Sequence, residues 1–280
     1  MIIDEKVMEN RKAIKITDVS TMLKVVKSIH YSDAMGLKWL RPRIYYRGQA
    51  HDWELKPSLF RKEYGVSMEY QLLNNAQRTL WKEMQTYSTY LEKLIFLQHY
   101  GFPTRLLDVT TNPLVALFFA CQPCKVNGRN RNGVIYVSCQ DEENNADIEK
   151  LCKVLFEYEL VDLSINNLEQ VGLSSSYHKL VTNNLYITPP INNNRIEAQQ
   201  GSFIFAKLFD LINGQYSSFA NNTSDMFEDK KFIIPQSCKE SILYELRELG
   251  ISEGSMFPDI EHKIKSTQQF VKDKFPYLRD

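Results

Sequence analysis

Apolar residues are densest between Leu94 and Ala120, yet polar residues interrupt this stretch at several points. Residues 94–100 continue a helical pattern, and Gly101 is placed to end that helix in the left-handed conformation common at helix ends. Residues 105–110 are few and mostly apolar, which is typical of a buried strand or turn. A buried polar group needs a hydrogen-bond partner, so the interruptions indicate either a structural network or a site.

A second helix follows this short strand. Asn112 supplies an N-cap and Pro113 the first helical position, a combination favoured at helix starts. The residues after Pro113, LVALFFAC, are apolar nearly all round, so this helix is expected to be buried. The predicted order is helix, tight turn, short strand, cap and buried helix, with Asp108, Thr110 and Thr111 at the junction between the strand and the second helix.

The rest of the chain alternates between helical and extended patterns, without an internal repeat or a linker. This alternation predicts one α+β domain over residues 1–280, with its core at about 20–270 and a peripheral helical insertion at about 140–185. The further elements expected are a strand end and helix over 14–29, a helical region over 67–100 broken once, a helix over 239–249, a final helix that follows residues 256–259 and runs to about 270, and extended segments at 44–46, 133–137, 186–190, 202–205 and 232–235.

Composition narrows the class of protein. The chain has 280 residues and a formal net charge of zero, so it lacks the overall basic excess of many nucleic-acid-binding proteins. The first residues are charged, and no run approaches the roughly 20 apolar residues of a membrane span, so we expect a cytoplasmic protein without a membrane partner. Five cysteines are an odd number and are expected to be reduced. Cys121 and Cys124 form a lone CxxC pair, expected to be buried small side chains rather than a metal or redox site.

Charged and polar candidates cluster in three places. Arg47 ends the strand over 44–46 and precedes Gly48 and Gln49, where a guanidinium can point into a cleft or form a structural ion pair. Arg105 and Asp108 lie three residues apart in the apolar stretch and are expected to pair with each other or with the backbone. His99 lies near a helix end, where the helix dipole favours it.

Hydroxyls and amides mark two further junctions. Thr110 and Thr111 precede the buried helix and serve either as hydrogen-bonding groups at its entry or as ligand-binding groups. Gln200 precedes the strand over 202–205, where a turn with local amide hydrogen bonds is the simpler interpretation. Glu197, three residues earlier, is either an exposed side chain or part of a site.

Three blocks of sequence carry a resemblance to a known family: YYRGQ with ELKPSLFR (45–61), LQHYGFPTRLLDVTTNPLVALFFA (97–120) and NNNRIEAQQGSF (192–203). Together they resemble the FRG domain family, named for a Phe/Tyr-Arg-Gly motif that is Tyr46, Arg47 and Gly48 here. The resemblance covers roughly residues 20–270.

The same blocks are more distantly similar to ADP-ribosyltransferases of the Arg-Ser-Glu type. In that comparison Arg47 matches the arginine that ends the first strand, and Thr110 and Thr111 match a Ser-Thr-Ser strand. Glu197 or Gln200 matches the glutamate that precedes a later strand. Thr-Thr replaces Ser-Thr-Ser in this chain, and Gln200 competes with Glu197 for the last position.

The similarity implies a split β-sheet core that binds NAD as a substrate, without a metal. The reaction would be ADP-ribosyl transfer to a protein or nucleic acid, or NAD hydrolysis, in a toxin or phage-defence setting. Breaking the nicotinamide–ribose bond passes through an oxocarbenium-like state, which a carboxylate stabilises, while arginine holds the pyrophosphate. The implied catalytic residues are Arg47, Thr110, Thr111, Glu197 and Gln200, and the implied NAD-binding residues are Tyr46, Arg47, Gly48, Gln49, His99, Arg105 and Asp108.

Two other functions fit the same residues. A non-catalytic module would bind a nucleotide or nucleic acid through Arg43, Arg47, Arg61 and Arg105. A hydrolase would instead use Asp108 and His99, although the sequence contains no dense acidic cluster for a metal ion.

Overall fold

The structure is a computed structural model of the 280-residue chain. It describes residues 14–33, 43–61, 64–140, 145–159, 169, 171–173, 177–189, 193–212, 215–217, 223–227 and 231–258. The final helix predicted to follow residues 256–259 falls outside these residues, as does part of the segment at 140–185.

Seven strands of the described residues form one sheet in the order β1-β11-β6-β2-β3-β8-β7. The β1–β11 pair is parallel and the other neighbouring pairs are antiparallel. The strands are β1 (Ile14–Lys15), β11 (Lys231–Ile234), β6 (Gly133–Gln140), β2 (Arg43–Gln49), β3 (Leu106–Thr110), β8 (Gly201–Phe205) and β7 (Leu185–Ile187). The mixture of this sheet with helices confirms that the domain contains both α and β structure.

The two halves of the sheet are joined weakly in the middle. Strand β2 pairs with β6 along its whole length, from Arg43 to Gln49. Strands β2 and β3, in contrast, share a single pair of Cα partners, Tyr46 and Thr110. Beyond that pair the two strands separate.

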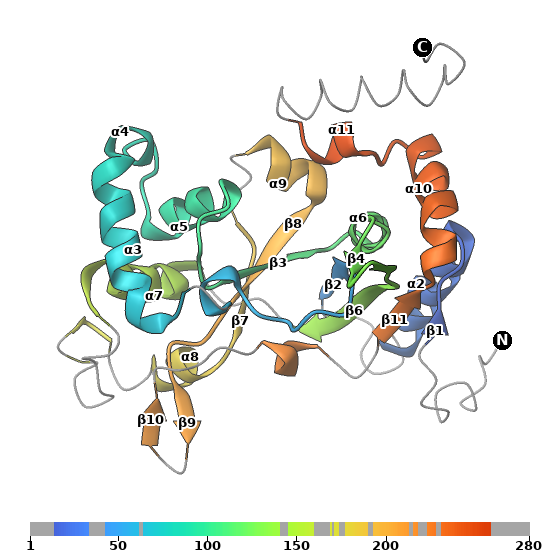
Figure 1. Ribbon diagram of the computed structural model, residues 1–280. Coiled ribbons are helices and arrows are strands. Elements are labelled where there is room, and N and C mark those ends of the chain that lie inside the picture. The colour runs from blue at the N-terminus through green and yellow to red at the C-terminus, as the bar shows by residue number, and fades with distance from the viewer. Residues whose placement is uncertain are drawn as a thin grey trace.

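Helices cover one face of the sheet in two groups (Figure 1). The first group consists of α2 (Val19–Asp33), α6 (Pro113–Ala120) and α10 (Lys239–Glu248), which pack on β2, β6 and β11. Asn112 caps α6 as predicted, because its Oδ1 accepts from the backbone N–H groups of Leu114 and Val115. The helix is buried along most of its length, which confirms the expectation from its apolar sequence.

The second group packs on β3, β8 and β7 and consists of α3 (Val66–Thr79), α4 (Trp81–Met84), α5 (Tyr90–His99) and α7 (Asn145–Glu157). The helical region over 67–100 is interrupted twice rather than once. Leu80 leaves the helical conformation, and Thr89 starts α5 through a capping box with Glu92. Helix α5 ends at His99, and Gly101 has a φ of 78°, as the sequence predicted.

The opposite face of the sheet is covered by connecting segments. Tyr45 and Tyr186 stack there with ring centroids 4.2 Å apart. The segment after β2 crosses this face and is tied down by Thr223, whose Oγ1 donates to the Leu55 carbonyl.

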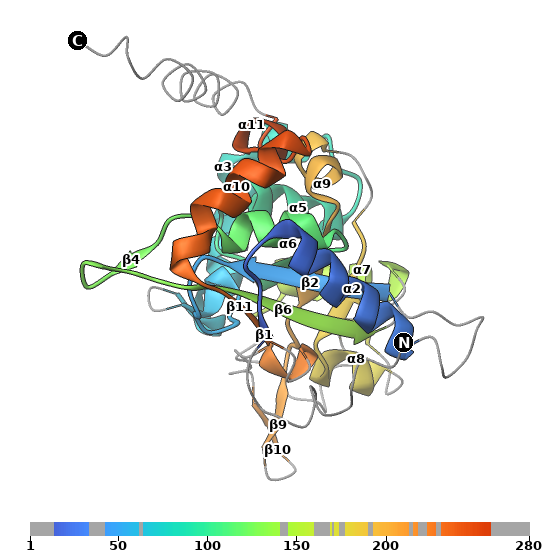
Figure 2. The ribbon, with the colours of Figure 1, turned by 90° about the vertical axis from the view of Figure 1, so that its right-hand side faces the viewer.

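The remaining elements are short. Figure 2 shows several of them at the periphery. They are η1 (Ser58–Phe60), β4 (Lys125–Val126), β5 (Arg129–Asn130), α8 (His178–Thr182), α9 (Asn194–Gln199), β9 (Asp210–Ile212), β10 (Gln215–Ser217), η5 (Ser224–Met226), η6 (Gln236–Cys238) and α11 (Glu253–Met256).

Candidate functional site

The weak junction of the sheet brings three predicted site positions together. Tyr46 on β2 pairs with Thr110 on β3, and Thr110 pairs with Gly201 on β8. Arg47 directly follows the first member of this row, and Gln200 directly precedes the last. The fold therefore brings the three segments that carry Arg47, Thr110 and Gln200 side by side, with Arg47 and Gln200 one residue to either side of the row and Arg47 on the sheet face of its partner Tyr136.

Hydroxyl groups fasten the end of β3 to the turn between α9 and β8. Thr110 Oγ1 donates to the main-chain oxygens of Gln199 at 2.7 Å and Gln200 at 3.2 Å. The backbone N–H of Thr111 also donates to the Gln200 oxygen, at 3.2 Å. These contacts fix the turn that carries Gln200, so the two threonines have a structural part at this junction.

Arg47 bridges the gap that opens between β2 and β3. Its Nη1 donates to the main-chain oxygen of Asp108 at 2.5 Å. Its Nε is buried and has no hydrogen-bond partner among the described residues. Burial lowers the pKa of the Arg47 guanidinium, the charge of Asp108 opposes this, and the nearby Arg61 reinforces it. A buried donor of this kind normally has an acceptor, so the arrangement favours an anionic ligand.

The carboxylate of Asp52, in the segment after β2, is engaged in a network of its own. Tyr136, which pairs with Arg47 across β2 and β6, donates its hydroxyl to Asp52, and Lys231 donates to the same carboxylate. Burial and the bond to Asp52 raise the pKa of Tyr136. This network holds the segment after β2 against the sheet without neutralising Arg47.

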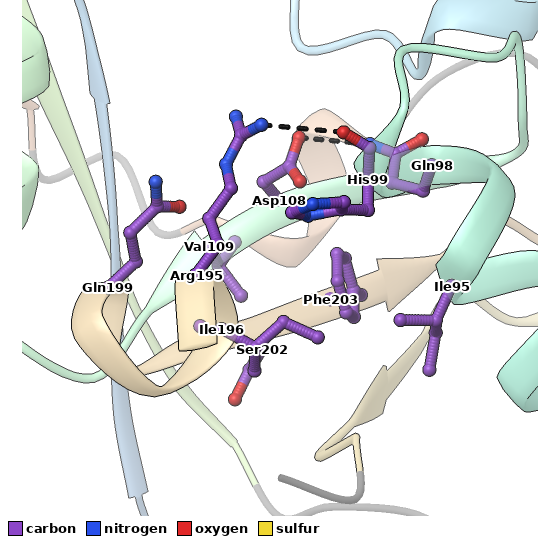
Figure 3. A pocket seen from close by; sticks show the side chains of 11 residues that line it. Ile95, Gln98, His99, Asp108, Val109, Arg195, Ile196, Gln199, Ser202 and Phe203 are labelled. Atoms are coloured by element: carbon purple, nitrogen blue, oxygen red, sulfur yellow. Dashed lines mark hydrogen bonds between the residues drawn. The ribbon is translucent and has the colours of Figure 1, made fainter. Parts of the chain in front are cut away.

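A pocket of about 40 Å³ lies on the helix-covered face, between α5, α9, β3 and β8 (Figure 3). Its volume suits a few water molecules or one polar group, well below the 300–1,000 Å³ typical of pockets for whole ligands. Its lining is Ile95, Gln98, His99, Asp108, Val109, Arg195, Ile196, Gln199, Gly201, Ser202 and Phe203.

Hydrogen bonds orient the polar part of this pocket. Gln98 receives a bond from Thr104 Oγ1 at 2.6 Å and donates from Nε2 to Asp108 Oδ2 at 3.0 Å. Arg195 Nη1 reaches the main-chain oxygen of His99 at 3.4 Å, and its guanidinium lies 4.8 Å from the centre of the Phe257 ring. Asp108 thus presents its carboxylate to the pocket and its main-chain oxygen to Arg47.

The expected pairing of Arg105 with Asp108 is wrong. Arg105 is fully buried and forms an ion pair with Glu69 of α3. Its Nη1 donates to the main-chain oxygens of Ala206 at 2.9 Å and Lys207 at 2.8 Å, which matches the other expectation, of bonding to the backbone. These contacts keep Arg105 in the core, so it cannot bind a ligand in this structure.

The neighbours of Arg47 in the Arg-Gly motif support the fold. Tyr46, one of the implied NAD-binding residues, is 1% exposed and packs against α6, so its ring is not accessible to a ligand in this structure. A Cβ atom at Gly48 would lie 1.8 Å from the Ala116 oxygen, so only glycine admits α6 at this distance. Gln49 is buried and donates from Nε2 to the main-chain oxygen of Trp53 at 2.9 Å.

Glu197 and Gln200, the two residues that could match the glutamate of the transferases, are both exposed. Gln200 has a φ of 44° and ends α9 in the left-handed region, which is uncommon for a residue other than glycine. Glu197 lies on α9 itself, and Asn193 caps that helix through the N–H groups of Arg195 and Ile196. The two side chains therefore start from one short helix and the turn that ends it.

Three polar pocket residues were not singled out as site candidates from the sequence. Gln98 and Gln199 belong to motifs that carried the family resemblance, and Arg195 lies two positions before Glu197. Their position in the same blocks as the candidates was the available signal. Their convergence depends on the pairing of β3 with β8, which residue patterns alone do not specify.

Two negative observations apply to the described part of the chain. It holds no group of three or more His, Cys, Asp or Glu side chains that could bind a metal ion. No helix within it has the length and apolar character needed to cross a membrane.

The structure thus defines a mixed α/β domain whose central sheet is weakly joined at an arginine with an unsatisfied buried donor. Residues 42–128 match the family model of the FRG domain. This match supports the resemblance over these residues, and it includes Arg47 and Asp108 but ends before Arg195. No curated protein and no solved structure matches the chain.

Proposed function

We propose that the junction of β2, β3 and β8 binds NAD or a related nucleotide and cleaves it, either in ADP-ribosyl transfer to a protein or nucleic acid or in hydrolysis. The observation that carries the proposal is the row formed by Tyr46, Thr110 and Gly201. It brings Arg47, the threonines at the end of β3 and the turn that carries Gln200 to neighbouring strands, in the order that the distant similarity to ADP-ribosyltransferases implies.

The state of Arg47 supports a nucleotide as the ligand. Its buried Nε lacks a partner within the described residues, and Arg61 lies close enough to lower its pKa. A pyrophosphate would satisfy the open donor and neutralise both guanidinium groups. The toxin or phage-defence setting rests on the resemblance.

The carboxylate that stabilises the oxocarbenium-like state is assigned to Glu197. Gln200 has an amide, which can hydrogen-bond a ribose hydroxyl but cannot deprotonate an acceptor. Both side chains are exposed at the end of α9, within reach of solvent and of a macromolecular acceptor. Glu197→Gln should therefore reduce turnover by about 10²–10⁴-fold, and Gln200→Glu should retain or raise it.

The direct test measures nicotinamide release from NAD by the full chain, alone and with lysate, using NAD labelled in the adenylate part. Arg47→Ala should lower release about 10²-fold or more, and Arg47→Lys should restore only part of it because lysine lacks the planar fork. Arg43→Ala is the matched control, since Arg43 is exposed on the same strand. Absence of both release and labelling in the wild type would overturn the proposal.

A non-catalytic binding module is the second candidate, and the proximity of Arg47 to Arg61 favours it specifically. Arg105 can no longer contribute, because Glu69 pairs with it in the core. Such a module would retain a nucleotide or single-stranded nucleic acid without releasing nicotinamide. Binding to nucleic acid would weaken steeply with salt, and Arg47→Ala would reduce that dependence.

A further inference from the structure

We propose that the pocket between α5 and α9 binds a planar ring bearing an amide edge, such as the ring of nicotinamide or of guanine. An amide edge places an N–H donor beside a carbonyl acceptor in one plane. The inference concerns binding of the ring alone, so it stands whether or not the chain cleaves NAD.

The first support is that two oppositely charged side chains, Asp108 and Arg195, line the same pocket and keep hydrogen-bonding groups without a partner in the described residues. Asp108 Oδ2 accepts from Gln98, whereas Oδ1 has no partner among the described residues. Arg195 uses Nη1 in a long bond to the His99 oxygen, and its Nε and Nη2 have no acceptor there either. In the same part of the chain, Arg195 and Asp108 form no ion pair with each other. One ligand with an adjacent donor and acceptor would satisfy both.

The second support is the shape and lining of the hollow. In Figure 3, Arg195 and Asp108 lie on the upper side and Phe203 and Ile196 on the lower side. Phe203 is 5% and Ile196 7% exposed, which gives a fixed apolar floor for the flat edge of a ring. A volume of about 40 Å³ admits that edge, while the remainder of the ring projects to the rim.

The third support lies beside the pocket. Tyr100 follows His99, is 74% exposed, and its ring lies 4.9 Å from the His99 ring at 87°. An exposed tyrosine ring next to a polar hollow offers a surface on which the outer part of a ligand ring can stack, worth about 1–3 kcal/mol for a nucleobase. The pocket therefore combines an apolar floor, an open donor and acceptor, and an aromatic rim.

The same features disfavour simple ions. The Asp108 carboxylate repels a carboxylate or phosphate placed in the hollow, and Arg195 repels an amine. Nicotinate is therefore a close control for nicotinamide, because it has the same ring but lacks the N–H donor. O6-methylguanosine is the corresponding control for guanosine, since methylation removes the ring amide.

Saturation-transfer NMR with the full chain tests the proposal, using nicotinamide and guanosine with their two controls. We expect one amide ligand to bind and its control not to bind. Asp108→Asn and Arg195→Gln should each raise the Kd about tenfold or more, since each removes a charged hydrogen-bond partner. Arg78→Gln, an exposed change on α3, should have no effect.

The two ligands distinguish whether the bound ring is a nicotinamide or a guanine base. Binding of nicotinamide would make the pocket a subsite for part of NAD, and binding of guanosine would make it a site for a guanine base. The proposal is overturned if neither binds, if the controls bind equally well, or if both substitutions leave the Kd unchanged. If one variant does not fold, the other variant and the wild-type selectivity still decide. Nicotinamide release from NAD is measured separately, so the failure of one proposal leaves the other standing.

Discussion

Replacing Gly48 with alanine should destabilise the domain strongly, because β2 and α6 are in backbone contact there. The added Cβ would lie 1.8 Å from the Ala116 oxygen and 2.7 Å from its carbonyl carbon. Ordinary contact begins at 3.4 Å, so the helix would have to move by about 1.6 Å. Helix α6 is packed against α2, α10 and the three strands β2, β3 and β6, which leaves no free space for that movement.

We expect the free energy of unfolding to fall by about 3 kcal/mol or more, the upper range for overpacking in a core. The melting temperature should fall by about 10 °C. Urea unfolding followed by far-UV circular dichroism measures the loss. Gly65→Ala is the matched control, because nothing lies within 4 Å of a Cβ at that position; as a helix cap it should cost only about 1 kcal/mol. A Gly48→Ala variant as stable as the wild type would refute the packing explanation of the Arg-Gly motif.

Three further predictions follow from buried and paired groups. Glu69→Ala should lower the free energy of unfolding by about 3–5 kcal/mol, because it leaves Arg105 buried and unpaired. The double change of Glu69→Leu and Arg105→Met should lower it less. Chemical denaturation of the wild type and both variants checks this, and equal losses in the two variants would contradict it. Burial raises the pKa of the Cys121 thiol to about 12, so at pH 8 only about one molecule in 10⁴ carries the thiolate; mass spectrometry after brief alkylation should find Cys124 and Cys238 modified well before Cys121 and Cys152. Burial alone would raise the pKa of Asp52, but the hydrogen bonds from Lys231 and Tyr136 bring it below 3.8. The stability that this carboxylate contributes is therefore present above about pH 4 and is lost as the pH falls further. Asp52→Asn should weaken the acid dependence of unfolding, and an unchanged acid profile would contradict a stabilising bond between Asp52 and Lys231.

Local signals predicted the elements that local contacts determine. Asn112 and Pro113 marked the start of α6 because a cap acts within three residues, and Gly101 marked the end of α5 because the left-handed conformation belongs to one residue. The partner of Arg105 could not be predicted in this way. Glu69 lies 36 residues earlier on another helix, and only tertiary packing brings the two charges together.

The candidate site likewise contains residues that the sequence predicted and a pocket that it did not. Arg47 was predictable from its position at the end of an aromatic strand, and Thr110 from its place at a strand-to-helix junction. The pocket was not predictable, because Asp108 and Arg195 meet through the register of β3 and β8, in which Asp108 pairs with Phe203. A shift of one residue would turn Asp108 to the other face, and neither strand's sequence alone specifies the pairing.

The unsatisfied donor of Arg47 gives the most direct test of the central claim, that a nucleotide binds where β2 and β3 separate. The Nε–H signal of Arg47 can be assigned in a ¹⁵N spectrum of arginine side chains by its loss in Arg47→Lys. Titration with NAD should shift this signal as the pyrophosphate accepts a hydrogen bond, and the Arg43→Ala variant should show the same shift. If the signal stays unchanged at NAD concentrations that saturate any binding, the nucleotide does not bind at Arg47 and the account is wrong.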